Sequence, residues 1–216
     1  LKKTILLFAV AIIFLTSCAV VSKYSHKEKE TLLLNHLNKW KNFRLNGIIE
    51  VNYQIFSFRK NIQIKKTGNL FRADIFDTGL LGLSPSPFLT AYYDSLLTLK
   101  LPGNESLVVI PQNKLLHDFP YINYLLDFQL LAQHKDKIIK NHRIELDDLT
   151  IYFSNQMEIS RVDRADKNYS LVLKYGKELQ EIIFLAENKT VADIIIDKIS
   201  FSEVNFKKIE PDFNLR

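Results

Sequence analysis

The chain has 216 residues, is 47% hydrophobic and 12% aromatic, and carries a formal net charge of +5 at pH 7. This apolar content can form a buried core, which excludes a disordered chain, and the length fits a single domain. Its 29 Lys and Arg are interspersed with 24 Asp and Glu, so the sequence lacks the dense basic stripe of a nucleic-acid-binding protein. A single cysteine excludes an intramolecular disulfide.

The first segment has the layout of a secretory signal. Lys2 and Lys3 are followed by an apolar run from Ile5 to Leu15. A basic start before a short apolar stretch is typical of such signals. The run is about half of the ~20 residues that a membrane-spanning helix needs, so we expect cleavage rather than a permanent span.

The expected cleavage site ends in the only cysteine. Leu15-Thr16-Ser17-Cys18 resembles the lipobox of bacterial lipoproteins, in which the cysteine receives diacylglycerol and becomes the first mature residue. The alternative is a buried cysteine beside an ordinary signal. Ala19 follows, whereas Asp at this position retains lipoproteins at the inner membrane of enteric bacteria. We therefore expect a protein that is lipid-anchored in the outer membrane and faces the periplasm.

Removing residues 1–17 leaves 199 residues, of which 18–30 read as the lipidated cysteine and a polar tether. A helix is expected over residues 27–42. Its apolar residues recur at spacings of three and four, as on one face of an amphipathic helix, and they are Leu33, Leu34, Leu37 and Trp40.

The period then changes to two. Odd positions between Phe43 and Phe56 are mostly apolar and even positions mostly polar, which predicts a long strand with one buried face. Gly47 in its middle predicts a bend or bulge. Further strands are expected at 61–66, 70–76, 88–94, 96–101 and 106–110. Glycines and prolines make residues 77–87 an apolar loop rather than a strand.

A second helix is expected over residues 120–133, where apolar residues are dense and Pro120 suits a helix start. Strands are then expected at 149–153, 158–163, 169–175, 179–185, 191–199 and 201–208. Two helices and two runs of antiparallel strands predict an α+β fold, in which a strongly curved antiparallel sheet, a half-open β-barrel, wraps around the helices. Residues 31–216 are expected to form this single domain.

The order of these parts resembles the LolA/LolB superfamily of periplasmic lipoprotein carriers, and within it the lipid-anchored LolB-like receptors. The features in common are the helix ending in Trp40, the Phe43-Arg44-Leu45-Asn46-Gly47 entry into the first strand, the Gly79-Leu80-Leu81-Gly82 loop and the closing strands through Asn205-Phe206. The Pro85-Ser86-Pro87 end of the loop departs from the family pattern.

This resemblance implies a non-enzymatic protein that binds acyl chains or lipoproteins in an apolar cavity and assists their delivery to the outer membrane. Its partners would be the lipid on Cys18, the membrane, and lipoprotein cargo or a periplasmic carrier. By loop position, Leu80, Leu81 or Leu83 would contact the membrane or a partner. The expected cavity-lining residues are Leu45, Ile49, Val51, Tyr53, Phe71, Ile75, Phe88, Tyr92, Leu125 and Phe128.

The sequence also bears on two other classes of function. An envelope protein that binds a partner through a sheet edge or the apolar loop, without carrying lipid, would show the same pattern if side chains filled the cavity. An enzyme is disfavoured because the five histidines lack metal-ligand spacing and no nucleophile or nucleotide-binding motif occurs. We therefore expect neither a metal nor a cofactor, and no catalytic residue.

Overall fold

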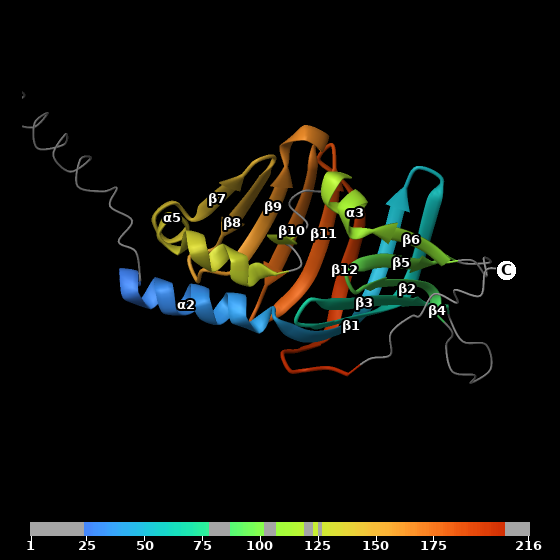
Figure 1. The fold of residues 1–216 in the computed structure, drawn as a ribbon, viewed down its shortest axis with the longest axis horizontal. Helices are drawn as coiled ribbons and strands as arrows, with labels where there is room; N and C mark the ends of the chain where they lie inside the picture. Colours follow the sequence, from blue (N-terminus) through green and yellow to red (C-terminus); the bar gives the residue numbers. More distant parts are fainter. Residues whose placement is uncertain (1–23, 78–86, 102–106, 119–122, 125–126, 206–216) are drawn as a thin grey trace, which may run out of the picture.

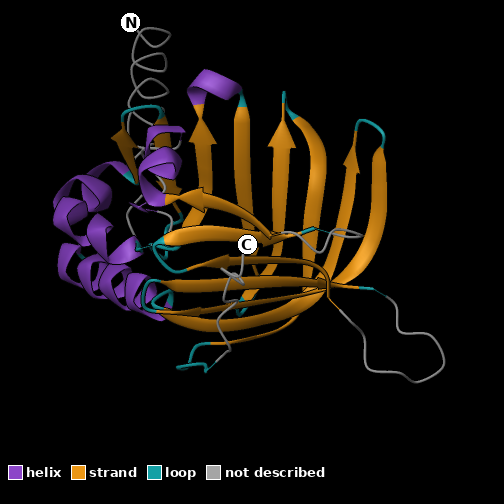
Figure 2. Cartoon of the chain, turned by 45° about the vertical axis from the view of Figure 1, so that its right-hand side comes forward, coloured by secondary structure: helices purple, strands orange, loops and turns teal. Residues whose placement is uncertain are grey.

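A computed structural model of the chain describes residues 24–77, 87–101, 107–118, 123–124 and 127–205. Twelve antiparallel strands form one sheet in the order β6-β5-β4-β3-β2-β1-β12-β11-β10-β9-β8-β7. Among the described strands, β6 and β7 each pair with one neighbour, so the sheet is not closed, and Figure 1 shows that it is curved. Figure 2 shows that the sheet bends, so that the strands of one part run crosswise to those of the other part.

The strands fall into two consecutive runs. The first run is β1 (Asn42–Tyr53), β2 (Phe56–Thr67), β3 (Leu70–Phe76), β4 (Pro87–Tyr93), β5 (Leu96–Lys100) and β6 (Leu107–Pro111). The second run is β7 (Arg143–Leu146), β8 (Leu149–Phe153), β9 (Ile159–Arg164), β10 (Tyr169–Tyr175), β11 (Leu179–Ala186) and β12 (Lys189–Ser200). Pairing of β1 with β12 joins the two runs into one sheet.

Among the described residues, the helices longer than one turn precede the first run or lie between the runs, and a 3₁₀ turn lies within the second run, between β9 and β10. They are α2 (His26–Lys39), α3 (Gln112–Asp118), the 3₁₀ helix η1 (Phe128–His134), α5 (Lys135–Asn141) and a single 3₁₀ turn, η2 (Ala165–Lys167). A capping box begins α2, because the Ser25 hydroxyl accepts from the Glu28 amide and the Glu28 carboxylate accepts from the Ser25 amide. None of the described helices is long and apolar enough to cross a membrane.

The predicted fold class, an α+β fold with an open curved sheet, is confirmed. Strands β3, β8 and β10 span the predicted residues. The helix predicted over 120–133 lies partly outside the described residues. Of its described part, Asn123 and Tyr124 are helical and residues from Phe128 on form η1, which continues into α5. The helices α3 and α5 and the strand β7 were not predicted.

The strand predicted at 201–208 is wrong over the described residues 201–205, which form no strand. Both edges of β12 are already taken by β1 and β11, so a following strand has no open edge beside it. Instead the chain turns away: the Phe201 ring packs edge-on against Trp40 at 6.2 Å, and the Val204 amide donates to the Thr67 hydroxyl at 3.1 Å.

A bend or bulge is predicted at Gly47, and the structure has a bulge there. The register of β1 against β12 shifts between Asn46 and Gly47. A Cβ on Gly47 would lie 2.2 Å from the backbone oxygen of Ile195, so only glycine fits this close approach of two strands. The bulge therefore lies at the junction of the two strand runs, where the sheet needs extra curvature.

Candidate functional site

The concave face of the sheet has two unequal halves. The part formed by β1 and β7–β12, here called the filled half, packs against α2, η1 and α5 (Figure 2). Its side chains fill the space under the helices. Residues of this core that are less than 2% exposed include Leu33, Leu37, Leu45, Leu131, Ile138, Ile151, Met157 and Ile159.

The part formed by β2–β6, here called the open half, is apolar but less covered. Ile62 and Ile75 belong to the buried core, which identifies the concave side of these strands. Strand pairing then places one row of residues side by side across β2 to β6, namely Ile64, Ala73, Ala91, Leu99 and Val108. Four of these five are half-buried, and Val108 is 39% exposed.

Ala73 and Ala91 lie directly opposite each other at the centre of this row, here called the alanine row. The adjacent rows carry larger side chains, with Ile75 and Leu89 paired on one side and Phe71 and Tyr93 paired on the other. This row therefore presents two methyl groups between bulkier neighbours. The arrangement suits a flexible hydrocarbon rather than a polar ligand.

Two lysines also lie on the concave face, and protein groups satisfy both. The Lys66 amino group donates to the carbonyl oxygen of Gly68 at 2.6 Å, and burial lowers the pKa of this lysine. Lys60 pairs with the Asp77 carboxylate, and its amino group lies 4.4 Å from the centre of the Phe88 ring. The open half therefore offers apolar contact as its main means of binding.

The opposite, convex face of the same strands carries a buried polar cluster. Arg72 forms two hydrogen bonds with the Asp74 carboxylate at 2.7 and 2.9 Å, and the Thr90 hydroxyl donates to the same carboxylate at 2.8 Å. Pairing places Tyr92 between Arg72 and Thr98 on this face. The expectation that Tyr92 lines a concave cavity therefore does not match its position.

The other expected cavity residues lie in different surroundings. Leu45, Ile49 and Ile75 are buried in the core, and Val51 and Phe88 are half-buried beside it. Phe71 is half-buried on the concave face, and Phe128 packs edge-on against Trp40 at 5.7 Å. Tyr53 lies at the end of the β1–β2 hairpin and is 42% exposed. Cys18, Leu80, Leu81, Leu83 and Leu125 lie outside the described residues.

The alanine row was missed in the sequence. Ala73 and Ala91 are single small residues within short strands, and their alignment depends on the register of β3 against β4. Leu97 and Leu99 alternate with Thr98 and were a usable signal for one face of β5. Leu96 precedes them, however, so the strand is apolar at consecutive positions and its face could not be assigned from sequence alone.

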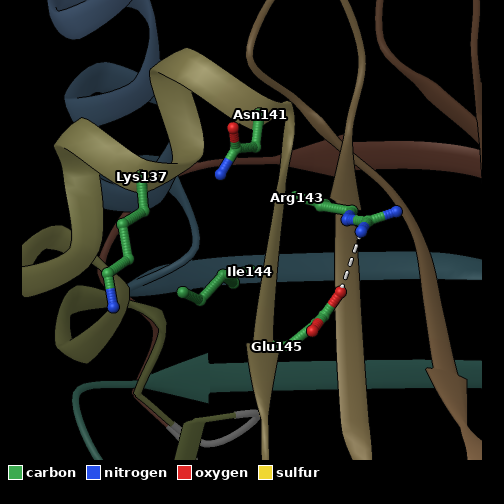
Figure 3. A pocket seen from close by; sticks show the side chains of 5 residues that line it. All are labelled: Lys137, Asn141, Arg143, Ile144 and Glu145. Atoms are coloured by element: carbon green, nitrogen blue, oxygen red, sulfur yellow. Dashed lines mark ion pairs between the residues drawn. The ribbon is translucent and has the colours of Figure 1, made fainter.

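A polar hollow of about 530 Å³ lies at the other edge of the sheet, between α5 and β7 (Figure 3). It is lined by Lys137, Asn141, Arg143, Ile144 and Glu145. Arg143 and Glu145 form an ion pair at 3.1 Å. Charged residues on a short edge strand protect it from pairing with other chains, which accounts for this hollow without a ligand. Among the described residues, His, Cys, Asp and Glu do not gather in a group that could hold a metal ion.

A buried histidine fastens α2 to the sheet of the filled half. The Nε2 atom of His36 accepts hydrogen bonds from Trp40 Nε1 at 3.0 Å and from the Ile159 amide at 3.1 Å. Burial, with a smaller contribution from Lys39, lowers the pKa of His36 to about 4. Protonation at Nε2 would remove the acceptor of both hydrogen bonds, so they form only while His36 is neutral.

Comparison with protein-family models finds no match, and neither does comparison with curated proteins. Among solved structures, the chain is similar to a LolA superfamily protein from Nitrosomonas europaea, with a TM-score of 0.44, 8% identity, and coverage of 82% of this chain and 95% of that one. It is also similar to a DUF1329 family protein from Desulfovibrio piger, with a TM-score of 0.38, 8% identity, and coverage of 82% and 92%. At these values the similarity carries no argument about function.

Proposed function

We propose that this chain is a non-enzymatic lipid-binding protein, anchored in the outer membrane and facing the periplasm, that holds acyl chains on its open half and assists their delivery to that membrane. The acyl chains would belong to lipids or to lipoproteins. One observation carries the proposal: the concave face of β2–β6 is apolar and only partly covered, whereas the same face of β1 and β7–β12 is filled.

The energetics favour a hydrocarbon ligand. Moving each CH₂ group out of water onto an apolar surface contributes ~0.8 kcal/mol, so an acyl chain gains affinity through length. Because Lys60 and Lys66 already have protein partners, the open half offers few polar groups that could bind a lipid head group. Binding would therefore depend on chain length and only weakly on the polar part of the cargo, as a carrier of varied lipoproteins requires.

Native mass spectrometry of the full chain purified from membranes tests the proposal. We expect co-purified lipid with the wild-type protein. Ala91→Phe places a large ring at the centre of the alanine row and should lower the fraction of protein with bound lipid several-fold. Asn61→Phe adds the same ring to the convex side of β2, where Asn61 is exposed and pairs with Ile48, and should leave lipid binding unchanged. Equal lipid in all three proteins, each with a normal melting temperature, would contradict binding on the open half.

The anchor is a separate part of the proposal and rests on Leu15-Thr16-Ser17-Cys18. Cys18→Ala should abolish incorporation of radioactive palmitate, because no other residue can form the thioether. Equal labelling of the variant and the wild type would remove the support for lipidation. Fractionation of inner and outer membranes then tests the outer-membrane address.

The loop containing Leu80, Leu81 and Leu83 is proposed to contact the membrane or a partner during transfer. Replacing all three leucines by Glu should leave the melting temperature unchanged and abolish lipid transfer to liposomes. A fall in the free energy of unfolding by several kcal/mol would instead show that the loop caps the core.

The alternative is an assembly lipoprotein that binds a protein partner of the envelope. The edge strand β6 favours it, because Val108 and Val109 are each 39% exposed and apolar, unlike the charged edge strand β7. An edge of this kind can accept a strand from another chain. Absence of co-purified lipid, combined with loss of a cross-linked partner in Val109→Lys, would support this alternative over the carrier.

A further inference from the structure

The β1–β2 hairpin projects beyond the strands on its β3 side. β2 pairs with β1 along its full length, but it pairs with β3 only from Asn61 to Thr67. Residues 56–60 and the turn at Gln54 and Ile55 therefore extend past the end of β3. Figure 1 shows this hairpin rising above β3 to β6, and at the same end of the sheet lies the β11–β12 turn.

The tip of this hairpin is apolar, which is unusual for a turn. Ile55 is 90% exposed and Tyr53 is 42% exposed. Gln54 adopts a positive φ of 54°, a conformation that in such turns favours Asn, Asp or Gly. This turn geometry gives no reason for the β-branched residue Ile55 beside it. The tight turns elsewhere in the described sheet are polar, namely Gly68-Asn69, Asp94-Ser95, Asp147-Asp148 and Glu187-Asn188.

The small size of the tip favours contact with a lipid surface over contact with a protein partner. A specific protein interface buries about 800 Å² on each side, far more than two side chains at a turn can offer. A bilayer accepts a single projecting isoleucine, and tyrosine is enriched at the boundary between head groups and acyl chains. We propose that the β1–β2 hairpin dips its tip into a lipid surface, with Ile55 among the acyl chains and Tyr53 at the interface.

One inserted isoleucine binds weakly, so the contact needs a second attachment that keeps the protein near the bilayer. Lipid on Cys18 would supply it. The first described residue, Tyr24, precedes α2, whose start lies at the opposite end of the molecule from the hairpin tip in Figure 1. The tip can therefore touch the anchoring membrane if the molecule lies flat, or a second bilayer if it stands upright. The contact does not depend on whether the open half binds acyl chains.

The full lipidated chain in liposomes of phosphatidylethanolamine and phosphatidylglycerol tests this inference. Gln54→Cys carries an environment-sensitive fluorophore at the tip while keeping Ile55, and Asn188→Cys carries it on the neighbouring polar turn. Nitroxide-labelled lipid is placed either in the anchoring liposomes or in a second, added population. We expect several-fold stronger quenching at position 54 than at position 188 in one of these arrangements, and the arrangement identifies which membrane is touched.

The variant Gln54→Cys with Ile55→Asp should lose this quenching while its melting temperature stays that of Gln54→Cys, because the Ile55 side chain makes little contact with the rest of the fold. Co-purified lipid should also be unchanged, which separates this contact from cargo binding. Equal, weak quenching at positions 54 and 188 in both arrangements overturns the proposal and leaves a protein partner to account for the exposed tip. Quenching that persists with Ile55→Asp also overturns it.

Discussion

The filled half and the open half share the same alternation of inward and outward side chains, but their inward side chains are buried to different extents. In β8, Leu149, Ile151 and Phe153 point under the helices and are at most 5% exposed. In β5, Leu97 and Leu99 hold the matching inward positions and remain half-buried. The difference shows that strand periodicity specifies which face is apolar, whereas the placement of helices decides whether that face becomes core or surface.

The largest effect is expected where the two halves meet. Gly47→Ala places a Cβ 2.2 Å from the Ile195 oxygen, and backbone atoms cannot move aside as a side chain can. We expect a loss of about 3 kcal/mol or more in unfolding free energy, measured by urea denaturation. Gly176→Ala is the control, because the atoms nearest to its added Cβ belong to the exposed, flexible side chain of Gln180. A stable Gly47→Ala protein would show that the junction is more adaptable than its register implies.

A matched pair of leucines compares the halves directly. Leu149→Ala removes a strand side chain that is 2% exposed in the filled half and should lower the unfolding free energy by about 3 kcal/mol. Leu99→Ala removes a half-buried one from the open half and should lower it by about 1 kcal/mol. Urea denaturation of both variants measures the difference. Equal losses would mean that the open half is packed as tightly as the filled half.

Acid should weaken the filled half through His36. Its pKa is lowered to about 4 in the folded chain from 6.5, so the stability that its neutral form contributes is complete above pH 6.5 and is lost as the pH falls toward 4. The loss approaches about 3 kcal/mol at the acid end of that range. His36→Gln keeps an acceptor for Trp40 and should flatten this part of the pH dependence. The readout is the difference between the two proteins, since Glu158, whose pKa burial raises, acts in the opposite direction.

A small effect, comparable with that of Leu99→Ala, is expected at the start of α2. Ser25→Ala removes the hydroxyl that accepts from the Glu28 amide and should lower the unfolding free energy by about 1 kcal/mol. Ser25→Asp keeps an acceptor and serves as the control. Because α2 covers only the filled half, lipid binding on the open half should be the same in all three proteins. A change in bound lipid would show that the two halves are coupled.

Much of the architecture could be read from local pattern. Period-two alternation located β1, and the three-four spacing of apolar residues located α2 to within a few residues. The helix α3 was not predicted because its leucines, Leu115 and Leu116, are adjacent and show no helical period. The strand β7 was not predicted because it has four residues, two of which are charged and exposed. Short elements carry too few residues for a period to show.

By itself, the sequence determined that the chain forms a long antiparallel sheet with a bulge at Gly47, since alternation and glycine act through local backbone geometry. Only the tertiary structure decided which apolar residues are core and which are half-exposed. Tyr92 and Tyr93 are adjacent and both aromatic, and the register of β3 against β4 alone turns the first to the convex face and the second to the concave face. The same register brings Ala73 opposite Ala91, because pairing between strands depends on residues that are distant in the chain.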